Sequence, residues 1–439
     1  MTDARAEFVE PPEQRRIVRT LVLAQVLSGA GLAAGITVGA LLAQDMLGAT
    51  SLAGLPIALL TVGSAAAAAG VGRLSQRLGR RAGLTTGYAV GAAGSAGVVL
   101  AAVAGNIPLL FVSLFVYGAG TATNLQARYA GADLAAPARR GRAVSTVLVA
   151  TTLGGVLGPT LVAPTGRIAL SWGIPALAGP FLLSGAAYAL AAVVLGVLLR
   201  PDPLLTARRL AADAATRPET DGAAPPGTGE RAVTRGVAVG ASVMILTQLV
   251  MVALMTMTPV HLTAHGHDVG AAGIVIAVHV AAMYLPSPVS GWLADRFGRV
   301  RVAVLSGITL LAAGVLAAAA PADSVVLLAV ALALLGLGWN LGLVSGTAMI
   351  TDSVPLARRA TVQGGVDVGI AIAGSGAGLA SGVVVAATSY PVLALAGAAA
   401  SLAIIPIVAV AARGAARGPG PAPVGPRAAP GSQGVSDAP

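Results

Sequence analysis

The sequence GRLSQRLGRR, residues 72–81, lies between two long apolar runs, and a near-copy, GWLADRFGRVR, occurs at residues 291–301. A second pair of similar stretches is ADLAAPARRGRA, which contains Asp133, and TDSVPLARRATV, which contains Asp352. Gly291 lies as far along the chain from Gly72 as Asp352 lies from Asp133, and we call this common spacing the repeat interval. Two different motifs repeated at one interval indicate an internal duplication of a membrane bundle. The residues matched in the first pair are Gly72 and Gly291, Arg77 and Arg296, Gly79 and Gly298, and Arg80 and Arg299.

The composition is that of a membrane protein. Of the 439 residues, 56% are hydrophobic and only 10% are charged, and the mean hydropathy is +0.84. A soluble domain carries about 25% charged residues. All 27 basic residues are arginines placed mostly in the predicted loops, so the net charge of +10 does not indicate nucleic-acid binding. The absence of cysteine excludes disulfides and thiolate metal sites.

Twelve apolar segments are long enough to span a bilayer, which requires about 20 residues each. The sequence therefore predicts an all-α membrane protein with twelve transmembrane helices in two homologous six-helix bundles. The predicted spans are 17–43, 51–72, 83–104, 107–131, 143–163 and 174–199 in the first half, and 235–260, 270–291, 301–320, 324–350, 361–386 and 391–412 in the second.

The rest of the chain divides around these bundles. We expect a cytoplasmic N-terminal segment at 1–16, which lacks the apolar core of a signal peptide. The bundles occupy 17–200 and 235–412. The segment 201–234 between them is rich in Pro, Gly, Thr and charge, so it is expected to be a flexible cytoplasmic linker with one short surface helix. A disordered cytoplasmic tail is expected at 413–439.

The arginines predict the orientation. With the N-terminus inside, Arg167 is the one arginine of the 27 that falls in a predicted outer loop. This distribution satisfies the positive-inside rule. We expect a multi-pass protein of the inner membrane, with both termini cytoplasmic.

Twelve spans, two homologous halves, a long central loop and the motif at 72–81 and 291–301 together resemble the major facilitator superfamily, in particular its twelve-helix drug:proton antiporter branch. The resemblance implies the major facilitator fold and secondary transport by alternating access. The segment GGVLGP also resembles the core of a helix-5 motif associated with proton-driven efflux, which favours export. Its matching residues are Gly154, Gly158 and Pro159.

The repeated motif is expected to act as a cytoplasmic gate. Its acidic residue can lie against the positive N-terminal end of a helix in the other half, and its arginines can pair with carboxylates. Such contacts exist only when that side is closed, so they bias a two-state equilibrium. The family's acidic residue is Gln76 in the first copy and Asp295 in the second, which predicts an asymmetric gate. The gate set is Gly72, Gln76, Arg77, Gly79, Arg80, Asp133, Gly291, Asp295, Arg296, Gly298, Arg299 and Asp352.

Asp367 and His279 lie inside predicted spans and are the candidates for proton coupling. Asp367 is the acidic residue well inside a span, roughly 10 Å deep at 1.5 Å per residue. It either binds a proton or substrate, which is the default for an intramembrane carboxylate, or pairs with an arginine near the cytoplasmic end. His279 is nine residues into its span, where it is either a proton carrier or substrate ligand, or a neutral hydrogen-bonded side chain.

The resemblance also implies a set of polar residues that line the central cavity, because helices 1, 4, 7 and 10 surround that cavity in the major facilitator fold. Each side chain is either a substrate contact or an interhelical hydrogen bond. Arg128 either pairs with Asp133 or meets an anionic substrate. The cavity set is Gln25, Asn124, Gln126, Arg128, Gln248, Trp339 and Asn340.

These observations favour a monomeric, proton-coupled secondary transporter that exports small organic or drug-like compounds. The alternative is proton-coupled uptake of a small metabolite, and a channel or transport-inactive sensor is a third reading. We expect no enzyme, because no two candidate catalytic groups are demonstrably close. We expect no ATP-driven pump, because no G-x-x-x-x-G-K-[ST] loop occurs. No cofactor or metal site is expected, although His261, His265 and His267 are closely spaced.

Overall fold

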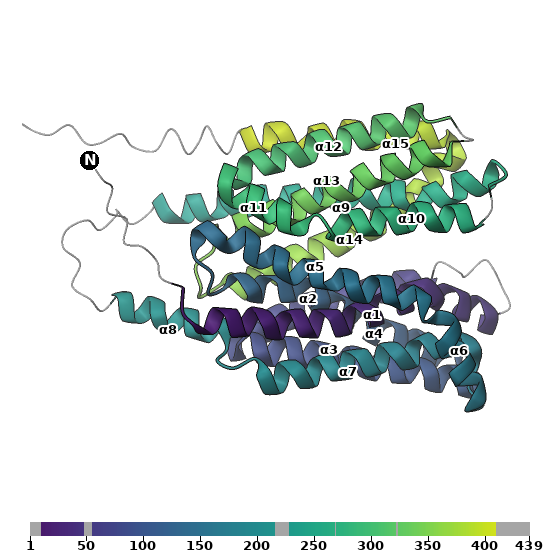
Figure 1. The fold of residues 1–439 in the computed structure, drawn as a ribbon, viewed down its shortest axis with the longest axis horizontal. Helices are drawn as coiled ribbons and strands as arrows, with labels where there is room; N and C mark the ends of the chain where they lie inside the picture. The colour runs from purple at the N-terminus through teal and green to yellow at the C-terminus, as the bar shows by residue number, and fades with distance from the viewer. Residues whose placement is uncertain (1–9, 48–54, 216–227, 268, 322–323, 410–439) are drawn as a thin grey trace, which may run out of the picture.

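The computed structural model describes residues 10–47, 55–215, 228–267, 269–321 and 324–409, and its helices form two bundles that lie side by side (Figure 1). Each bundle contributes six spans. The first bundle consists of α1 (Glu13–Leu47), α2 (Leu55–Leu78), α3 (Arg80–Ala104), α4 (Ile107–Ala132), α5 (Arg140–Thr160) and α7 (Gly179–Leu198). The short helices η2 (Pro137–Arg139), α6 (Val162–Ser171) and η3 (Ala176–Ala178) connect them.

The second bundle begins with α9 (Thr228–Ala264) and follows the same order. Its eighth span is interrupted, because prolines at 286 and 288 end α10 and start the next helix. The remaining helices are α10 (Val269–Tyr284), α11 (Ser287–Phe297), α12 (Arg299–Ala319), α13 (Val325–Ser353), α14 (Arg359–Ala387) and α15 (Tyr390–Leu402). In the described part of the chain, ten helical segments are long and apolar enough to cross a membrane.

The segment between the bundles contains one helix, α8 (Pro203–Ala215), inside the stretch for which the sequence predicts a short surface helix. Asp202 precedes it, and its carboxylate accepts hydrogen bonds from the backbone N–H groups of Leu204 and Leu205. The same carboxylate accepts from the N–H of Arg81 at 2.8 Å. The start of α8 is therefore attached to the start of α3.

The two motif glycines explain why the chain turns sharply after α2 and α11. Gly79 has φ of 93° and Gly298 has φ of 94°, a backbone conformation that only glycine adopts readily. Each glycine separates two helices by a single residue. The motif therefore places Arg80 at the start of α3 and Arg299 at the start of α12.

Each half has its own apolar core, and small residues let the helices approach closely. A Cβ on Gly91 of α3 would lie only 2.6 Å from the backbone nitrogen of Gly120 of α4. The core of the second half also takes in Val144 and Leu148 of α5, which belongs to the first half.

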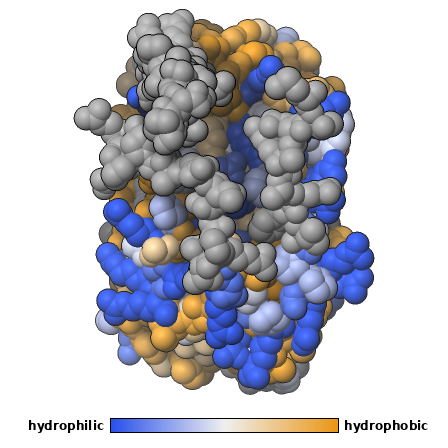
Figure 2. Space-filling view, turned by 90° about the vertical axis from the view of Figure 1, so that its left-hand side faces the viewer, coloured by the Kyte–Doolittle hydropathy of each residue, from blue (hydrophilic) through white to orange (hydrophobic). Residues whose placement is uncertain are grey.

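The halves touch through α2 against α14 and through α5 against α11. A Cβ on Gly72 would lie 3.0 Å from Cα of Gly364, and a Cβ on Gly291 would lie 2.8 Å from the backbone carbon of Gly141. We call this end of the molecule, which comprises residues 72–81, 128–142, 291–301 and 350–364, the arginine-rich end. It lies at the left in Figure 1, and Figure 2 shows hydrophilic side chains over much of this face.

Candidate functional site

The two copies of the motif make equivalent contacts with the opposite half. Asp295 accepts hydrogen bonds at 2.9 Å from the backbone N–H groups of Gly141 and Arg142, in the first turn of α5. In the other copy, Oε1 of Gln76 accepts from the N–H groups of Ala360 and Thr361, at 2.8 and 3.4 Å, in the first turn of α14. Helix N-termini carry a partial positive charge, so both acceptors are well placed.

Gln76 makes two further contacts that a carboxylate is unable to make. Its Nε2 donates to the carbonyl of Leu356 at 3.1 Å and to that of Ala357 at 2.7 Å. The two contact sets therefore differ in charge and in donors, and the two donors of Gln76 were not part of the sequence argument, so the predicted asymmetry of the gate stays a prediction.

Replacing Gln76 by aspartate is expected to weaken the closed arginine-rich end. The variant gains about 0.3–1 kcal/mol of charge–dipole energy, but it loses two donors worth about 0.5–1.5 kcal/mol each. The measurement is the distance between spin labels on Leu78→Cys and Phe297→Cys, both exposed, in a chain that has no cysteine of its own. Asp295→Asn is the comparison in the other copy, where it removes the charge and one of the two acceptor oxygens. A shorter mean distance in Gln76→Asp would contradict this reading.

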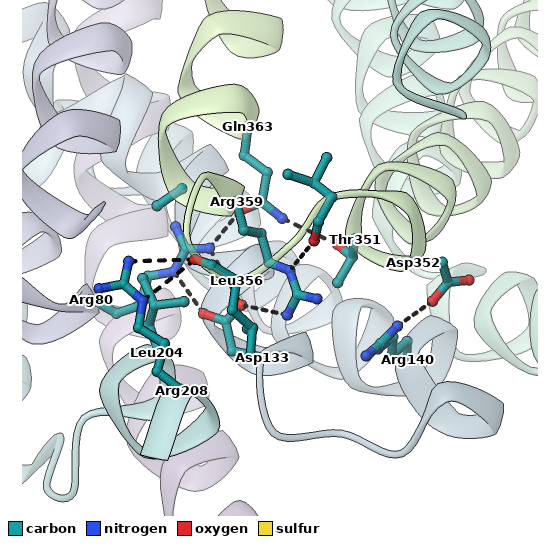
Figure 3. Close-up of polar contacts among 12 residues, drawn as sticks. Arg80, Asp133, Arg140, Leu204, Arg208, Thr351, Asp352, Leu356, Arg359 and Gln363 are labelled. Atoms are coloured by element: carbon teal, nitrogen blue, oxygen red, sulfur yellow. Dashed lines mark hydrogen bonds and ion pairs between the residues drawn. The ribbon is translucent and has the colours of Figure 1, made fainter. Parts of the chain in front are cut away.

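Two ion-pair clusters join the halves near the surface, and Figure 3 shows the first together with the Arg140–Asp352 pair of the second. In the first, Asp133 binds Nε of Arg80 at 2.7 Å and lies 3.7 Å from Nη1 of Arg359 in the other half. We call these three residues the Asp133 clasp. All three of its side chains are less than a tenth exposed.

The second cluster is related to the first by the repeat interval. Asp352 binds Nε of Arg299 at 3.1 Å and Nη1 of Arg140, in the other half, at 2.6 Å. We call these three residues the Asp352 clasp. Its carboxylate is 33% exposed, so the pairing is screened by solvent and is weaker than that of a buried group.

A third, deeper contact crosses between the halves. Nη2 of Arg128 on α4 donates to Oδ1 of Asp367 on α14 at 2.7 Å, with side-chain exposures of 0% and 3%. Tyr129 donates its hydroxyl to the same oxygen at 3.1 Å and accepts from Arg128 at 2.8 Å. Nε of Arg128 donates to Thr347 of α13 at 3.1 Å. Arg128 therefore pairs with Asp367, while Asp133 is occupied by Arg80 and Arg359.

The remaining first-half cavity candidates form a buried hydrogen-bond network. Gln25 donates to Thr151 at 3.0 Å and to the carbonyl of Asn124 at 3.1 Å, and it accepts from Tyr88 at 2.7 Å. Gln126 donates to the carbonyl of Ala68 at 2.7 Å. These side chains therefore link helices within the first half.

The second-half candidates are also hydrogen-bonded. Trp339 donates to Gln248 at 2.8 Å, and its ring packs edge-on against Tyr284. Asn340 is fully buried and donates to Met283 and Ser287 of the eighth span. Within the parts of the chain that the structure describes, the hydrogen bonds and the ion pair of Arg128 go to other residues than Gln248, Trp339 and Asn340.

His279 and the three clustered histidines lie apart from the buried ion pair. Nδ1 of His279 lies 2.8 Å from the carbonyl of Leu332, so it carries the proton and donates within its own half. The ring of His261 stacks on that of Tyr390 and lies tilted against that of His265. Among the residues described, no group of three or more His, Cys, Asp or Glu side chains has an arrangement that could hold a metal ion.

The predicted helix-5 motif falls partly outside the description. Gly154 is buried in α5, whose backbone stays helical to Thr160. The surroundings of Gly158 and Pro159 lie outside the described residues. Arg77 and Arg296 are exposed in the last turns of α2 and α11.

The linker helix also contacts both halves at the arginine-rich end. Nη2 of Arg208 on α8 donates to the carbonyl of Gln76 at 2.8 Å. It also donates to the carbonyl of Leu356 at 3.4 Å (Figure 3). Arg208 therefore bridges the second span of the first half and the loop before α14.

Comparison with known proteins agrees with this architecture. The family model described as Major Facilitator Superfamily matches residues 21–268 and 240–435. The chain belongs to the major facilitator superfamily. Two relatives from Bacillus subtilis (strain 168) are the uncharacterized MFS-type transporters YdeG and YddS. YdeG is 55% identical over 397 residues, covering 89% of this chain and 92% of the relative. YddS is 51% identical over 391 residues, covering 88% and 89%.

A more distant relative is described by its substrate. The riboflavin transporter RfnT of Brucella anthropi is 32% identical over 372 residues, covering 84% of this chain and 86% of the relative. The solved proton:xylose symporter XylE has a TM-score of 0.72 at 16% identity, covering 92% of this chain and 96% of its own. The human organic anion transporter MFSD10 has a TM-score of 0.71, also at 16% identity, with coverages of 91% and 100%. These two show the major facilitator fold alone.

Membership of the major facilitator superfamily makes this a multi-pass membrane protein and a secondary transporter of small molecules, not an enzyme. In such transporters the two halves rock against each other, and contacts between halves decide which side is closed. The hydrogen bonds and ion pairs described above that cross between the halves lie at or near the arginine-rich end. This transporter is therefore closed at that end.

Sequence reasoning missed two polar residues of this closed region. Tyr129 looks like an apolar packing residue beside Arg128, and Gln363 lies one turn before Asp367 on α14. Gln363 accepts a hydrogen bond from Arg80 and donates to Thr351 at 3.2 Å. Gln363 and Asp367 are four residues apart and so share one helix face, and this spacing is the signal from which Gln363 could have been found once Asp367 was singled out.

Substituting Gly72 by alanine is expected to open the arginine-rich end. The new Cβ would lie 2.8 Å from the carbonyl oxygen of Ala360 and 3.0 Å from Cα of Gly364, and such overpacking costs about 1–3 kcal/mol. Gly70→Ala is the matched control, because Gly70 lies on the same helix and a Cβ at that position has no neighbour within 4 Å. The Leu78–Phe297 label distance should lengthen in Gly72→Ala only; an equal response in the two variants would contradict the packing argument.

Proposed function

We propose that this protein is a proton-coupled secondary active transporter that works by alternating access, with Asp367 as the proton-binding group. The observation that carries the proposal is the buried pair between Arg128 of the first half and Asp367 of the second. A proton on Asp367 removes the charge that Arg128 faces and weakens a contact that exists only when this end is closed. Proton binding then shifts the equilibrium between the two conformations.

We assign the arginine-rich end to the cytoplasm and the protein to the inner membrane, as a monomer with both termini cytoplasmic. The positive-inside rule supports this assignment. In this orientation the conformation is closed to the cytoplasm. The substrate-contact set remains Gln25, Asn124, Gln126, Arg128, Gln248, Trp339 and Asn340, and His279 has a secondary role in setting the pH optimum.

Export of small organic compounds is the direction that we propose, supported by the Gly154–Pro159 segment of α5. The second candidate is uptake of a metabolite, which the similarity to a riboflavin transporter favours. The two candidates share the proton site and differ in whether the proton and the substrate move in opposite directions or together.

The test uses purified protein in proteoliposomes with a pH-sensitive dye inside and a panel of compounds that includes riboflavin. A transported compound is expected to cause a proton flux that depends on its concentration. Flux opposite to the compound supports export by antiport, and flux in the same direction supports uptake by symport. Transport of a compound without any proton movement would overturn the proton coupling.

A further inference from the structure

Tyr129 connects the buried ion pair to one of the two clasps. The guanidinium carbon of Arg128 lies 4.2 Å from the centroid of the Tyr129 ring, and that of Arg80 lies 5.9 Å from it. Both distances are within cation–π range. Arg128 holds Asp367, and Arg80 holds Asp133. The ring, which is fully buried, thus contacts the arginines of two separate ion pairs.

The same two arginines also donate hydrogen bonds to side chains on one face of α14. Arg80 donates to Gln363 and Arg128 donates to Asp367, four residues further along the helix. The titratable or charged groups that face Asp367 are Arg128 and Tyr129 of α4 and, at greater distance, Arg80 of α3. The polar column from Asp367 to the Asp133 clasp is therefore continuous and buried.

The Asp352 clasp has no such column. By the repeat interval, the counterparts of Tyr129, Gln363 and Asp367 are Ala348, Val144 and Leu148. All three are buried, and Val144 and Leu148 pack in the apolar core of the second half. Buried polar residues thus connect the Asp133 clasp to Asp367, whereas apolar residues occupy the equivalent positions beside the Asp352 clasp.

The charges in this column explain how neutralisation of Asp367 would affect the Asp133 clasp. The column contains three guanidiniums, of Arg80, Arg128 and Arg359, and the two carboxylates of Asp133 and Asp367. Neutralising Asp367 leaves the three cations with a single carboxylate in a buried space, where like charges repel strongly. Arg359 belongs to the opposite half and lies 3.7 Å from Asp133, so it is the cation free to move away.

We propose that Tyr129 is a positioning residue that couples the charge state of Asp367 to the Asp133 clasp and not to the Asp352 clasp. The proposal rests on the proposed function only in naming the proton as the natural cause of neutralisation. Loading of Asp367 then releases one clasp first, and the partly exposed Asp352 clasp separates afterwards as the halves move. The gate opens in a set order, although its two clasps are related by symmetry.

The test is a pair of double-mutant cycles, which measure coupling between two sites. Asp367→Asn is combined with Asp133→Asn in one cycle and with Asp352→Asn in the other. The readout is the ratio of closed to open populations from the Leu78→Cys and Phe297→Cys label distance. We expect non-additivity of about threefold or more in the Asp133 cycle and of less than about 1.5-fold in the Asp352 cycle.

Tyr129 is then tested directly. Tyr129→Leu should reduce the Asp133–Asp367 coupling to less than about 1.5-fold, and Tyr129→Phe, which keeps the ring, should retain part of it. Tyr88→Leu is the control, because Tyr88 is also fully buried in the first half but bonds to Gln25 and Ser28. A merely structural role for Tyr129 would give Tyr88→Leu the same effect on coupling.

Equal coupling in the two cycles, or coupling unchanged by Tyr129→Leu, would overturn the proposal. Should the Asp133 variant fail to fold, Arg359→Gln and its counterpart Arg140→Gln replace the two clasp variants. These cycles need neither substrate nor gradient. They can therefore fail while Asp367→Asn still abolishes proton-driven transport, and they can succeed while the proton assignment fails.

Discussion

Asp367→Asn is expected to abolish accumulation of substrate driven by a pH gradient while leaving exchange of substrate across the membrane intact. Asparagine is uncharged at every pH, so it mimics the proton-loaded carboxyl group permanently. Its Oδ1 can still accept a hydrogen bond from Arg128, which keeps the bundle assembled. Accumulation in proteoliposomes should fall to the level seen without a gradient, while exchange of labelled for unlabelled compound should stay within about twofold of the wild type, a difference of only some 0.4 kcal/mol.

The matched control is Asp45→Asn, which removes an exposed carboxylate near the C-terminal end of α1. It should accumulate substrate as the wild type does. If Asp367→Asn retained full gradient-driven accumulation, Asp367 would not carry the coupling proton. The role would then pass to His279, the other ionisable side chain that we assigned to coupling.

Arg128→Met is expected to be more destabilising than any single substitution within the gate set. It leaves the Asp367 carboxylate buried without its cation, and breaking a buried pair in this way costs about 3–5 kcal/mol. Arg128 also holds Tyr129 and Thr347, so its loss loosens α4 against α13 and α14. Thermal unfolding in detergent should show a melting temperature well below that of the wild type.

The double variant Arg128→Met with Asp367→Leu is the rescue. Replacing a buried ion pair by apolar side chains of similar size is often neutral or stabilising. The double variant should therefore recover most of the lost melting temperature and yet fail to accumulate substrate. A double variant as unstable as Arg128→Met would mean that the lost stability came from packing of the long side chain and not from an unpaired charge.

The sequence predicts the fold well because each feature that determines it is local or repeated. Twelve apolar runs, arginines between them and a single repeat interval suffice to predict two six-helix halves. The contact of Asp295 with a helix N-terminus in the other half also follows, because the motif copies and the helix starts can be located independently. The break between α10 and α11 was not predicted, since the prolines at 286 and 288 lie in an otherwise apolar run.

The Arg128–Asp367 pair shows what one sequence leaves open. Both residues were singled out, but position along a helix gives depth alone. The direction of a side chain around its helix, and the helix that it faces, depend on how the bundles pack. For that reason Asp133 was an equally good partner for Arg128 from the sequence. Tyr129 was missed because an aromatic side chain in an apolar span has the pattern of a packing residue.

The position of α8 has a kinetic consequence. Arg208 bonds to carbonyls of both halves, so those bonds must break each time the gate opens and form again each time it closes. They contribute to the barrier of that step and lie away from the buried ion pair between α4 and α14. The segment between the halves therefore does more than connect them, because its sequence sets part of the turnover rate. Substitutions in α8 can change that rate without altering substrate affinity.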